Sequence, residues 1–233
     1  MVTVTDATQR RAPRAAKTTS VFKKAVMAIS GIILVLYLIA HMIGNLKAFA
    51  GKEEFNHYSE WLRTIGNPAL PGATALWIIR LVLLAAVFAH IWAAVSLWRQ
   101  ARRARPQGYV TKKAVAQSYA SRTMRWGGVI IAAFVIWHLL DLTWGTVNSK
   151  GDASPYERLV ASFSNPVSTA FYAIAVILVG MHLRHGIWSA TQTLGQSNRR
   201  RELTVNYTAT AIATVLTIGF LLTPFSVLFG LID

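Results

Sequence analysis

Five long apolar runs constrain the fold of this 233-residue chain more strongly than any other feature of its sequence. Each run reaches or exceeds the roughly 20 residues that a helix needs to cross about 30 Å of hydrocarbon. Charged residues make up 14% of the chain, well below the roughly 25% typical of soluble domains. We therefore predict an all-α integral membrane protein, with one bundle of five transmembrane helices in residues 21–233. The predicted spans cover about residues 21–49, 73–98, 124–147, 166–190 and 204–231.

Positive charge gathers on alternate connections between these spans and predicts their orientation. Residues 1–20 and the connections after the second and fourth spans are basic, whereas the other two connections are nearly balanced. Basic connections tend to stay in the cytoplasm, so we predict a cytoplasmic N-terminus and place Asp233 outside. Residues 1–20 lack the apolar core of a signal peptide and are expected to form a disordered cytoplasmic tail. We assign the net charge of +15 to contacts with anionic lipid headgroups or a cytoplasmic protein, rather than to nucleic acid.

The connections on the outer side have helical features of their own. Aromatic and aliphatic residues recur at helix-like intervals between residues 55 and 65, and they predict a short interfacial helix. The breakers Asn67 and Pro68 are expected to end this helix. A helical turn is predicted over residues 156–163, and Pro224 predicts a kink near the outer end of the last span.

Each of the first four spans carries a histidine whose depth in the membrane can be calculated. At 1.5 Å per residue from the inner ends of their spans, His41 and His138 lie roughly 20–25 Å from the inner face. His90 and His182 lie roughly 9–15 Å from the same face. A single histidine in a span often only hydrogen-bonds a neighbouring helix. Four histidines that match in depth two by two favour a shared function.

Two pairs of imidazoles at two depths are suited to bind two haem b groups. His41 and His138 can supply both axial ligands of an outer haem, and His90 and His182 those of an inner haem. Six-coordinate iron has no open position for a substrate, which indicates electron transfer. The chain has no cysteine, which excludes disulfides, thiolate zinc sites and cysteine-ligated iron–sulfur clusters within it. The remaining alternative is a proton relay or transporter, but the sequence shows neither broken helices nor repeated halves.

Further ionisable residues lie beside these histidines. Spacing alone does not separate His185 from His182 as a ligand, and His185 can instead meet a haem propionate, a quinone or a neighbouring helix. Arg184 can pair with a propionate or extend to the inner interface. Asp141 follows His138 by three residues and is either a proton-handling group near the outer haem or an interfacial acid with its carboxylate in water. We favour the second interpretation of Asp141.

Four short segments around the histidines resemble a known family. They are LIAHMIGNL around His41, FAHIWAAVSLW around His90, VIWHLLD around His138 and MHLRHGIWSATQTLG around His182. Their order and spacing are similar to those of the di-haem cytochrome b membrane anchor of succinate dehydrogenases and fumarate reductases, in the form where one five-helix polypeptide makes up the whole anchor. The resemblance extends over nearly the whole chain after residue 20.

The resemblance also bears on which histidine of the fourth span is a ligand. In the family pattern, the ligand histidine is followed four positions later by glycine and then by an aromatic residue. Gly186 and Trp188 match this pattern when His182 is the ligand, which favours His182 over His185. One departure is Ala94, which stands where the family has glycine four residues after the histidine of the second span.

A function in a succinate:quinone oxidoreductase follows from the resemblance. It implies that the chain anchors a flavoprotein subunit and an iron–sulfur subunit at the cytoplasmic face of the cell membrane and performs no succinate chemistry itself. Electrons would pass from the iron–sulfur subunit to the inner haem, then to the outer haem, and finally to a quinone. In single-chain di-haem forms the quinone is usually menaquinone, with its site near the outer haem. Our candidates for that site are Glu60, Arg63 and Asp141.

Other functions remain open at the level of the sequence. One alternative is a di-haem cytochrome b subunit of another respiratory enzyme, of the nitrate reductase or hydrogenase type. The others are a proton-coupled transporter and a structural anchor that has lost its haems. A reduced-minus-oxidised optical spectrum separates the redox functions from the last two.

Overall fold

We describe the chain from a computed structural model that covers residues 19–104, 115–148, 152–193 and 198–233. Within these ranges the chain is helical and contains no strand, which confirms the all-α prediction. The α-helices are α1 (Ser20–Leu46), α2 (Lys52–Thr64), α3 (Thr74–Ala104), α4 (Val115–His138), α5 (Pro155–Phe163), α6 (Pro166–Thr193) and α7 (Arg199–Leu228). Two short elements join them, the 3-10 helix η1 (Lys47–Ala50) and the π-helix η2 (Leu139–Thr143).

Five segments are long and apolar enough to cross a membrane, as predicted. They run through α1, α3, α4 with η2, α6 and α7. The third span ends at Thr143 rather than at residue 147, because the chain turns at Gly145, whose φ of 67° suits glycine. The tail predicted over residues 1–20 falls almost wholly outside the described residues. The orientation of the spans remains a prediction.

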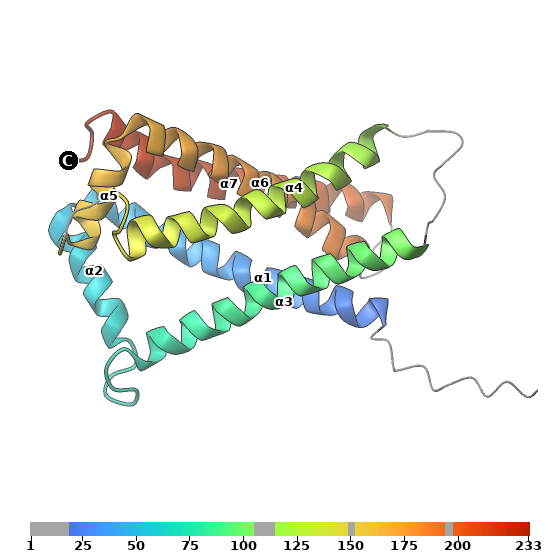
Figure 1. Cartoon of the computed structure of the whole chain (residues 1–233), viewed down its shortest axis with the longest axis horizontal. Helices are drawn as coiled ribbons and strands as arrows, with labels where there is room; N and C mark the ends of the chain where they lie inside the picture. Colours follow the sequence, from blue (N-terminus) through green and yellow to red (C-terminus); the bar gives the residue numbers. More distant parts are fainter. Residues whose placement is uncertain (1–18, 105–114, 149–151, 194–197) are drawn as a thin grey trace, which may run out of the picture.

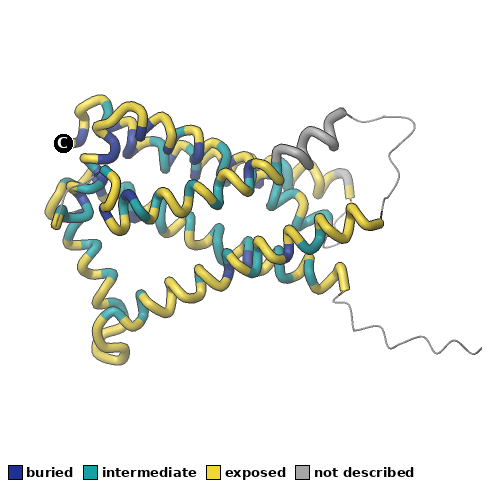
Figure 2. The backbone as a smooth tube through the Cα atoms, in the orientation of Figure 1, coloured by how far each residue is buried: buried dark blue, intermediate teal, exposed yellow. Residues whose placement is uncertain are grey.

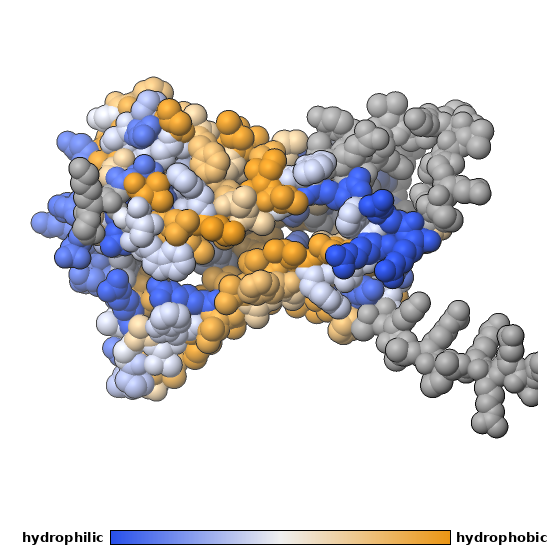
Figure 3. Space-filling view, viewed as in Figure 1, coloured by the Kyte–Doolittle hydropathy of each residue, from blue (hydrophilic) through white to orange (hydrophobic). Residues whose placement is uncertain are grey.

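The two ends of the bundle differ in structure (Figure 1). The helices α2 and α5 and the C-terminal residues 229–233 lie together at one end, which we call the capped end. The opposite end, which we call the basic end, holds the C-terminus of α3 with Arg102 and Arg103 and the start of α7 with Arg200. Figure 3 shows hydrophobic residues concentrated between these ends, as a bilayer requires.

Helix pairing within the bundle depends on small residues. α6 packs extensively along α7, and α1 packs along α3 and α7. Gly180 of α6 faces Thr217 of α7 so closely that an added Cβ would overlap the Thr217 Oγ1. Gly219 of α7 meets Met42 of α1 in the same way. Helices in lipid gain no hydrophobic drive from association, so close backbone approach at small residues stabilises their packing.

Burial is greatest at the capped end (Figure 2). One buried cluster joins α2, α5, α6 and the C-terminal residues, with Phe55, Tyr156, Phe163, Tyr172 and Ile232 among its members. Elsewhere the spans expose many large apolar side chains, which a lipid environment accommodates. The short helix α2 is the predicted interfacial helix, and it begins after a glycine with a positive φ.

A capping box fixes the start of α5. The Ser154 hydroxyl accepts from the backbone N–H of Glu157, and the Glu157 carboxylate accepts from the backbone N–H of Ser154. Pro155 occupies the first helical position, where its missing N–H costs nothing. These features make α5 a full helix over Pro155–Phe163, where the sequence predicted only a helical turn.

Candidate cofactor site

His41 of α1 and His138 of α4 meet inside the bundle toward the capped end. Their ring centroids lie 5.7 Å apart, with the ring planes at 86°. Tyr37, one turn before His41, stacks on the His41 ring at 5.2 Å, and Phe220 of α7 lies 5.8 Å from it. The structure therefore brings together the two histidines that were paired by depth in the outer half of the membrane.

His90 of α3 and His182 of α6 form the second pair. Their ring centroids lie 6.2 Å apart, with the planes at 64°. The His90 Nδ1 is 3.2 Å from the carbonyl oxygen of Met27 and 3.3 Å from the Ser30 hydroxyl, both on α1. Because a carbonyl only accepts, the Met27 contact places a hydrogen on Nδ1 and leaves the lone pair on Nε2.

The spacing of both pairs fits a metal held between two imidazoles. A metal–imidazole bond of about 2 Å and roughly 1 Å from the nitrogen to the ring centre put two such centroids about 6 Å apart. The observed centroid distances of 5.7 and 6.2 Å are close to this value. Among the described residues, neither α1 with α4 nor α3 with α6 is a closely packed helix pair, so the paired rings meet between helices that stand apart.

Unsatisfied nitrogens support the same fit. His138 and His182, one from each pair, have a buried Nδ1 without a hydrogen-bond partner in the described structure. A buried polar atom without a partner costs free energy and calls for an explanation, such as a bound group. No cluster of three or more histidine or carboxylate side chains suited to a metal ion occurs in the described ranges. The donor sets are thus pairs of imidazoles, which suit the two axial positions of an iron porphyrin.

The two ionisable neighbours of His182 have different surroundings. His185 is partly buried on α6. Arg184 is exposed, and its Nε donates to the Thr210 hydroxyl of α7 at 2.9 Å. The guanidinium thus bonds across to α7, and its contact with a propionate remains a prediction, as does that of His185.

Asp141 is not in water, and our interpretation of it as a solvated interfacial acid is wrong. The residue is 1% exposed and lies in η2. Its Oδ1 accepts from the Asn148 amide at 2.9 Å, and its Oδ2 accepts from the hydroxyls of Ser162 at 2.6 Å and Tyr172 at 2.8 Å. These donors lie on the following loop, on α5 and on α6, so one carboxylate joins three parts of the capped end.

A pocket of about 340 Å³ opens on the face of α2. Glu60 and Arg63 are exposed on the same helix but are not among its lining residues. Tyr58 of α2 packs directly against Gly44 of α1, where an added Cβ would lie 3.0 Å from the Tyr58 Cε1. The pocket was missed at the sequence level, although the spacing of its α2 residues is a visible helical signal. Its lining residues are Lys47, Glu54, His57, Tyr58 and Trp61.

Comparison with known proteins identifies the family. The model of the succinate dehydrogenase/fumarate reductase transmembrane subunit matches residues 99–222, which is more than half of the chain. The chain belongs to this family. It is also 24% identical over 162 residues to the succinate dehydrogenase cytochrome b558 subunit of Bacillus subtilis (strain 168), covering 69% of this chain and 72% of that protein. No solved structure matches significantly.

Membership in the succinate dehydrogenase/fumarate reductase transmembrane subunit family confirms the resemblance inferred from the histidine segments. Together with the five apolar spans, it makes the chain a multi-pass protein of the cell membrane and a membrane-anchor subunit. Family membership favours a membrane-anchor subunit of this kind over the nitrate reductase, hydrogenase and transporter alternatives. The matched region includes His138 and His182 but begins after His41 and His90.

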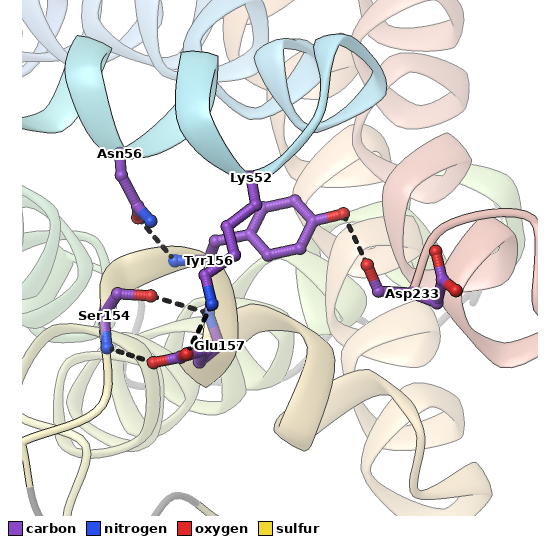
Figure 4. Close-up of polar contacts among 6 residues, drawn as sticks. All are labelled: Lys52, Asn56, Ser154, Tyr156, Glu157 and Asp233. Atoms are coloured by element: carbon purple, nitrogen blue, oxygen red, sulfur yellow. Dashed lines mark hydrogen bonds and ion pairs between the residues drawn. The ribbon is translucent and has the colours of Figure 1, made fainter.

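In this family member, a polar network closes the capped end (Figure 4). Lys52 of α2 forms an ion pair with Glu157 of α5 at 2.7 Å. The Lys52 Nζ also donates a hydrogen bond to the Glu157 carboxylate in this ion pair. This bond, together with the hydrogen bonds from Ser154, lowers the pKa of Glu157 to about 2. The Tyr156 hydroxyl donates to the carbonyl oxygen of Asp233 at 2.9 Å, and burial raises the pKa of Tyr156. The network thus ties α2, α5 and the C-terminal residues together.

Proposed function

We propose that this chain is the membrane anchor and electron conduit of a succinate:quinone oxidoreductase and holds two haem b groups. The observation that carries the proposal is the meeting of four imidazoles, from four helices, in two pairs with the spacing of axial ligands. The name of the Bacillus subtilis relative, a cytochrome b558 subunit, supports haem b as the bound group. When bound, the haems supply one-electron transfer between the two sides of the membrane.

The residues of this chain hold and orient those groups. His41 and His138 would hold the outer haem, and His90 and His182 the inner haem. The carbonyl oxygen of Met27 fixes the His90 ring with Nε2 free to coordinate iron, which is the usual function of a hydrogen-bonding partner behind a metal ligand. The four rings are partly buried among apolar spans, so a group that they hold would lie in largely apolar surroundings.

The overall reaction is divided between subunits. In the complex, a flavoprotein subunit takes two electrons and two protons from succinate, and an iron–sulfur subunit passes the electrons to this chain. A membrane quinone, in our proposal menaquinone, takes two electrons and two protons to become the quinol. The arginines of the basic end favour contact with the iron–sulfur subunit and with anionic headgroups at the cytoplasmic face.

The pocket on α2 supports a quinone site at the capped end. Tyr58 and His57 can donate hydrogen bonds to the two carbonyl oxygens of a quinone, and Trp61 offers an apolar face to its ring. Glu54 also lines the pocket and can deliver protons from the outer solution. Glu60 and Arg63 remain candidates near this site, whereas Asp141 is enclosed behind α5 and α6.

The test is an optical and haem-content analysis of the purified complex with each of five histidines changed to alanine. We expect two haems per wild-type chain and the loss of one haem in each of His41→Ala, His90→Ala, His138→Ala and His182→Ala. His185→Ala is the matched control and should keep both. A wild-type complex without haem would overturn the proposal, and loss of haem in His185→Ala but not in His182→Ala would overturn the ligand assignment. Co-purification of a flavin-bearing subunit tests the partner.

A further inference from the structure

Asp141 is the only carboxylate among the fully buried side chains of the described structure. Its three hydrogen-bond donors are an amide and two hydroxyls, all of them neutral. An ionised carboxylate only accepts hydrogen bonds, and the donors fit this form on both oxygens. The arrangement therefore holds a negative charge inside the protein without a positive partner in direct contact within the described ranges.

This charge lies next to the outer histidine pair. Asp141 follows His138 by three residues, about one helical turn. Tyr172 contacts both, because its hydroxyl donates to Asp141 while its ring centroid lies 6.0 Å from that of His138. The same tyrosine ring packs on Phe134 and Phe163, so the surroundings are apolar and screen the charge weakly.

A cation of α5 lies beside the segment that follows Asp141. Arg158 of α5 donates to the carbonyl oxygen of Thr143 at 2.8 Å, two residues beyond Asp141. Among the residues that the structure describes, it forms no ion pair with the carboxylate. The inner pair has different neighbours, since the atoms hydrogen-bonded to His90 are the carbonyl of Met27 and the hydroxyl of Ser30.

We infer that Asp141 is a positioning residue that lowers the reduction potential of the group held by His41 and His138. Oxidised iron carries one more positive charge than reduced iron, so a nearby fixed negative charge favours the oxidised form. The hydrogen bonds to α5 and α6 also fix the turn that follows His138. The inference rests on the proposed binding of haem at this pair, and it gives the buried carboxylate at the end of this span a function.

The test is a redox titration of both haems in the purified complex with Asp141→Asn. Asparagine preserves the shape of the side chain and removes its charge. We expect the oxidised-to-reduced ratio of the outer haem at fixed ambient potential to fall by tenfold or more, an upward shift of about 59 mV for one electron. The potential of the inner haem should not change. Glu53→Gln, which removes an exposed charge from the same end of the molecule, is the matched control and should shift neither haem.

A second variant separates charge from structure. Tyr172→Phe keeps the ring and the carboxylate but removes one donor, so the charge is less neutralised and the outer potential should fall. A purely structural function of the network predicts shifts in the same direction in both variants, and that result would overturn the inference. An unchanged outer potential in Asp141→Asn with both haems bound would also overturn it, while the proposed function would stand. If Asp141→Asn does not assemble, the sign of the Tyr172→Phe shift decides.

Discussion

Gly44 sets how closely Tyr58 approaches the bundle, and this contact shapes the pocket on α2. A Cβ at Gly44 would lie 3.0 Å from Cε1 and 3.1 Å from the hydroxyl oxygen of Tyr58. Overpacking of this kind costs about 1–3 kcal/mol, and 1.4 kcal/mol corresponds to about tenfold in an equilibrium. We expect Gly44→Val to displace Tyr58 and to lower kcat/KM for a soluble menaquinone analogue by about tenfold, with both haem spectra unchanged.

The control for this prediction is Ala40→Val, which adds volume at an exposed position one turn earlier on the same helix. It should leave quinone reduction unchanged. Equal activity of Gly44→Val and the wild type, measured in the same detergent, would show that the pocket beside Tyr58 does not bind the quinone.

Single residues also show how far the sequence determines the site. The two histidine pairs could be matched from the sequence, because depth along a straight helix depends only on residue count. The burial of Asp141 could not be predicted from the sequence, because its hydrogen-bond donors Ser162 and Tyr172 lie 21 and 31 residues away along the chain. A carboxylate near the end of a span is exposed or enclosed according to where a separate loop helix packs, and no local pattern records that packing.

At the level of elements, α5 depends on an ion pair that acid should break. The pKa of Glu157 is lowered from 4.5 to about 2, chiefly by the hydrogen bond from Lys52 and then by those from Ser154. A lowered pKa means that this carboxylate stabilises the folded state fully above about pH 4.5 and progressively less as the pH falls toward 2. We expect hydrogen-exchange protection of the α5 amides, corrected for intrinsic rates, to decrease over this range.

Glu157→Gln provides the comparison. This variant should show reduced protection of α5 already at pH 5 and little further loss below that pH. Glu53→Gln, one residue from Lys52 but outside the ion pair, should behave like the wild type. An acid-induced loss of protection that is as steep in Glu157→Gln as in the wild type would assign the effect to another group.

The elements themselves were largely predictable, and their ends less so. The spans and the interfacial helix α2 follow from length and periodicity, which are local properties. The third span was predicted to run to residue 147, but a π-helix and the turn at Gly145 end it earlier. The hydrogen bonds of Asp141 hold this segment from α5 and α6, so its geometry depends on tertiary contacts.

At the scale of the whole molecule, we expect the basic end of the bundle to face the cytoplasm and the capped end to face the outside. The basic end presents Arg102 and Arg103 from α3 and Arg200 from α7, whereas the capped end carries charges of both signs, among them the ion pair of Lys52 and Glu157. Basic segments are retained in the cytoplasm, and the same end would meet the iron–sulfur subunit. We expect a reporter enzyme that works only outside the cytoplasm to be active when it is fused after Asp233. A reporter that works only inside the cytoplasm should be active when it is fused before Met1. The reverse pattern would put the pocket on α2 at the cytoplasmic face, and the order in which electrons reach the two histidine pairs would then also be reversed.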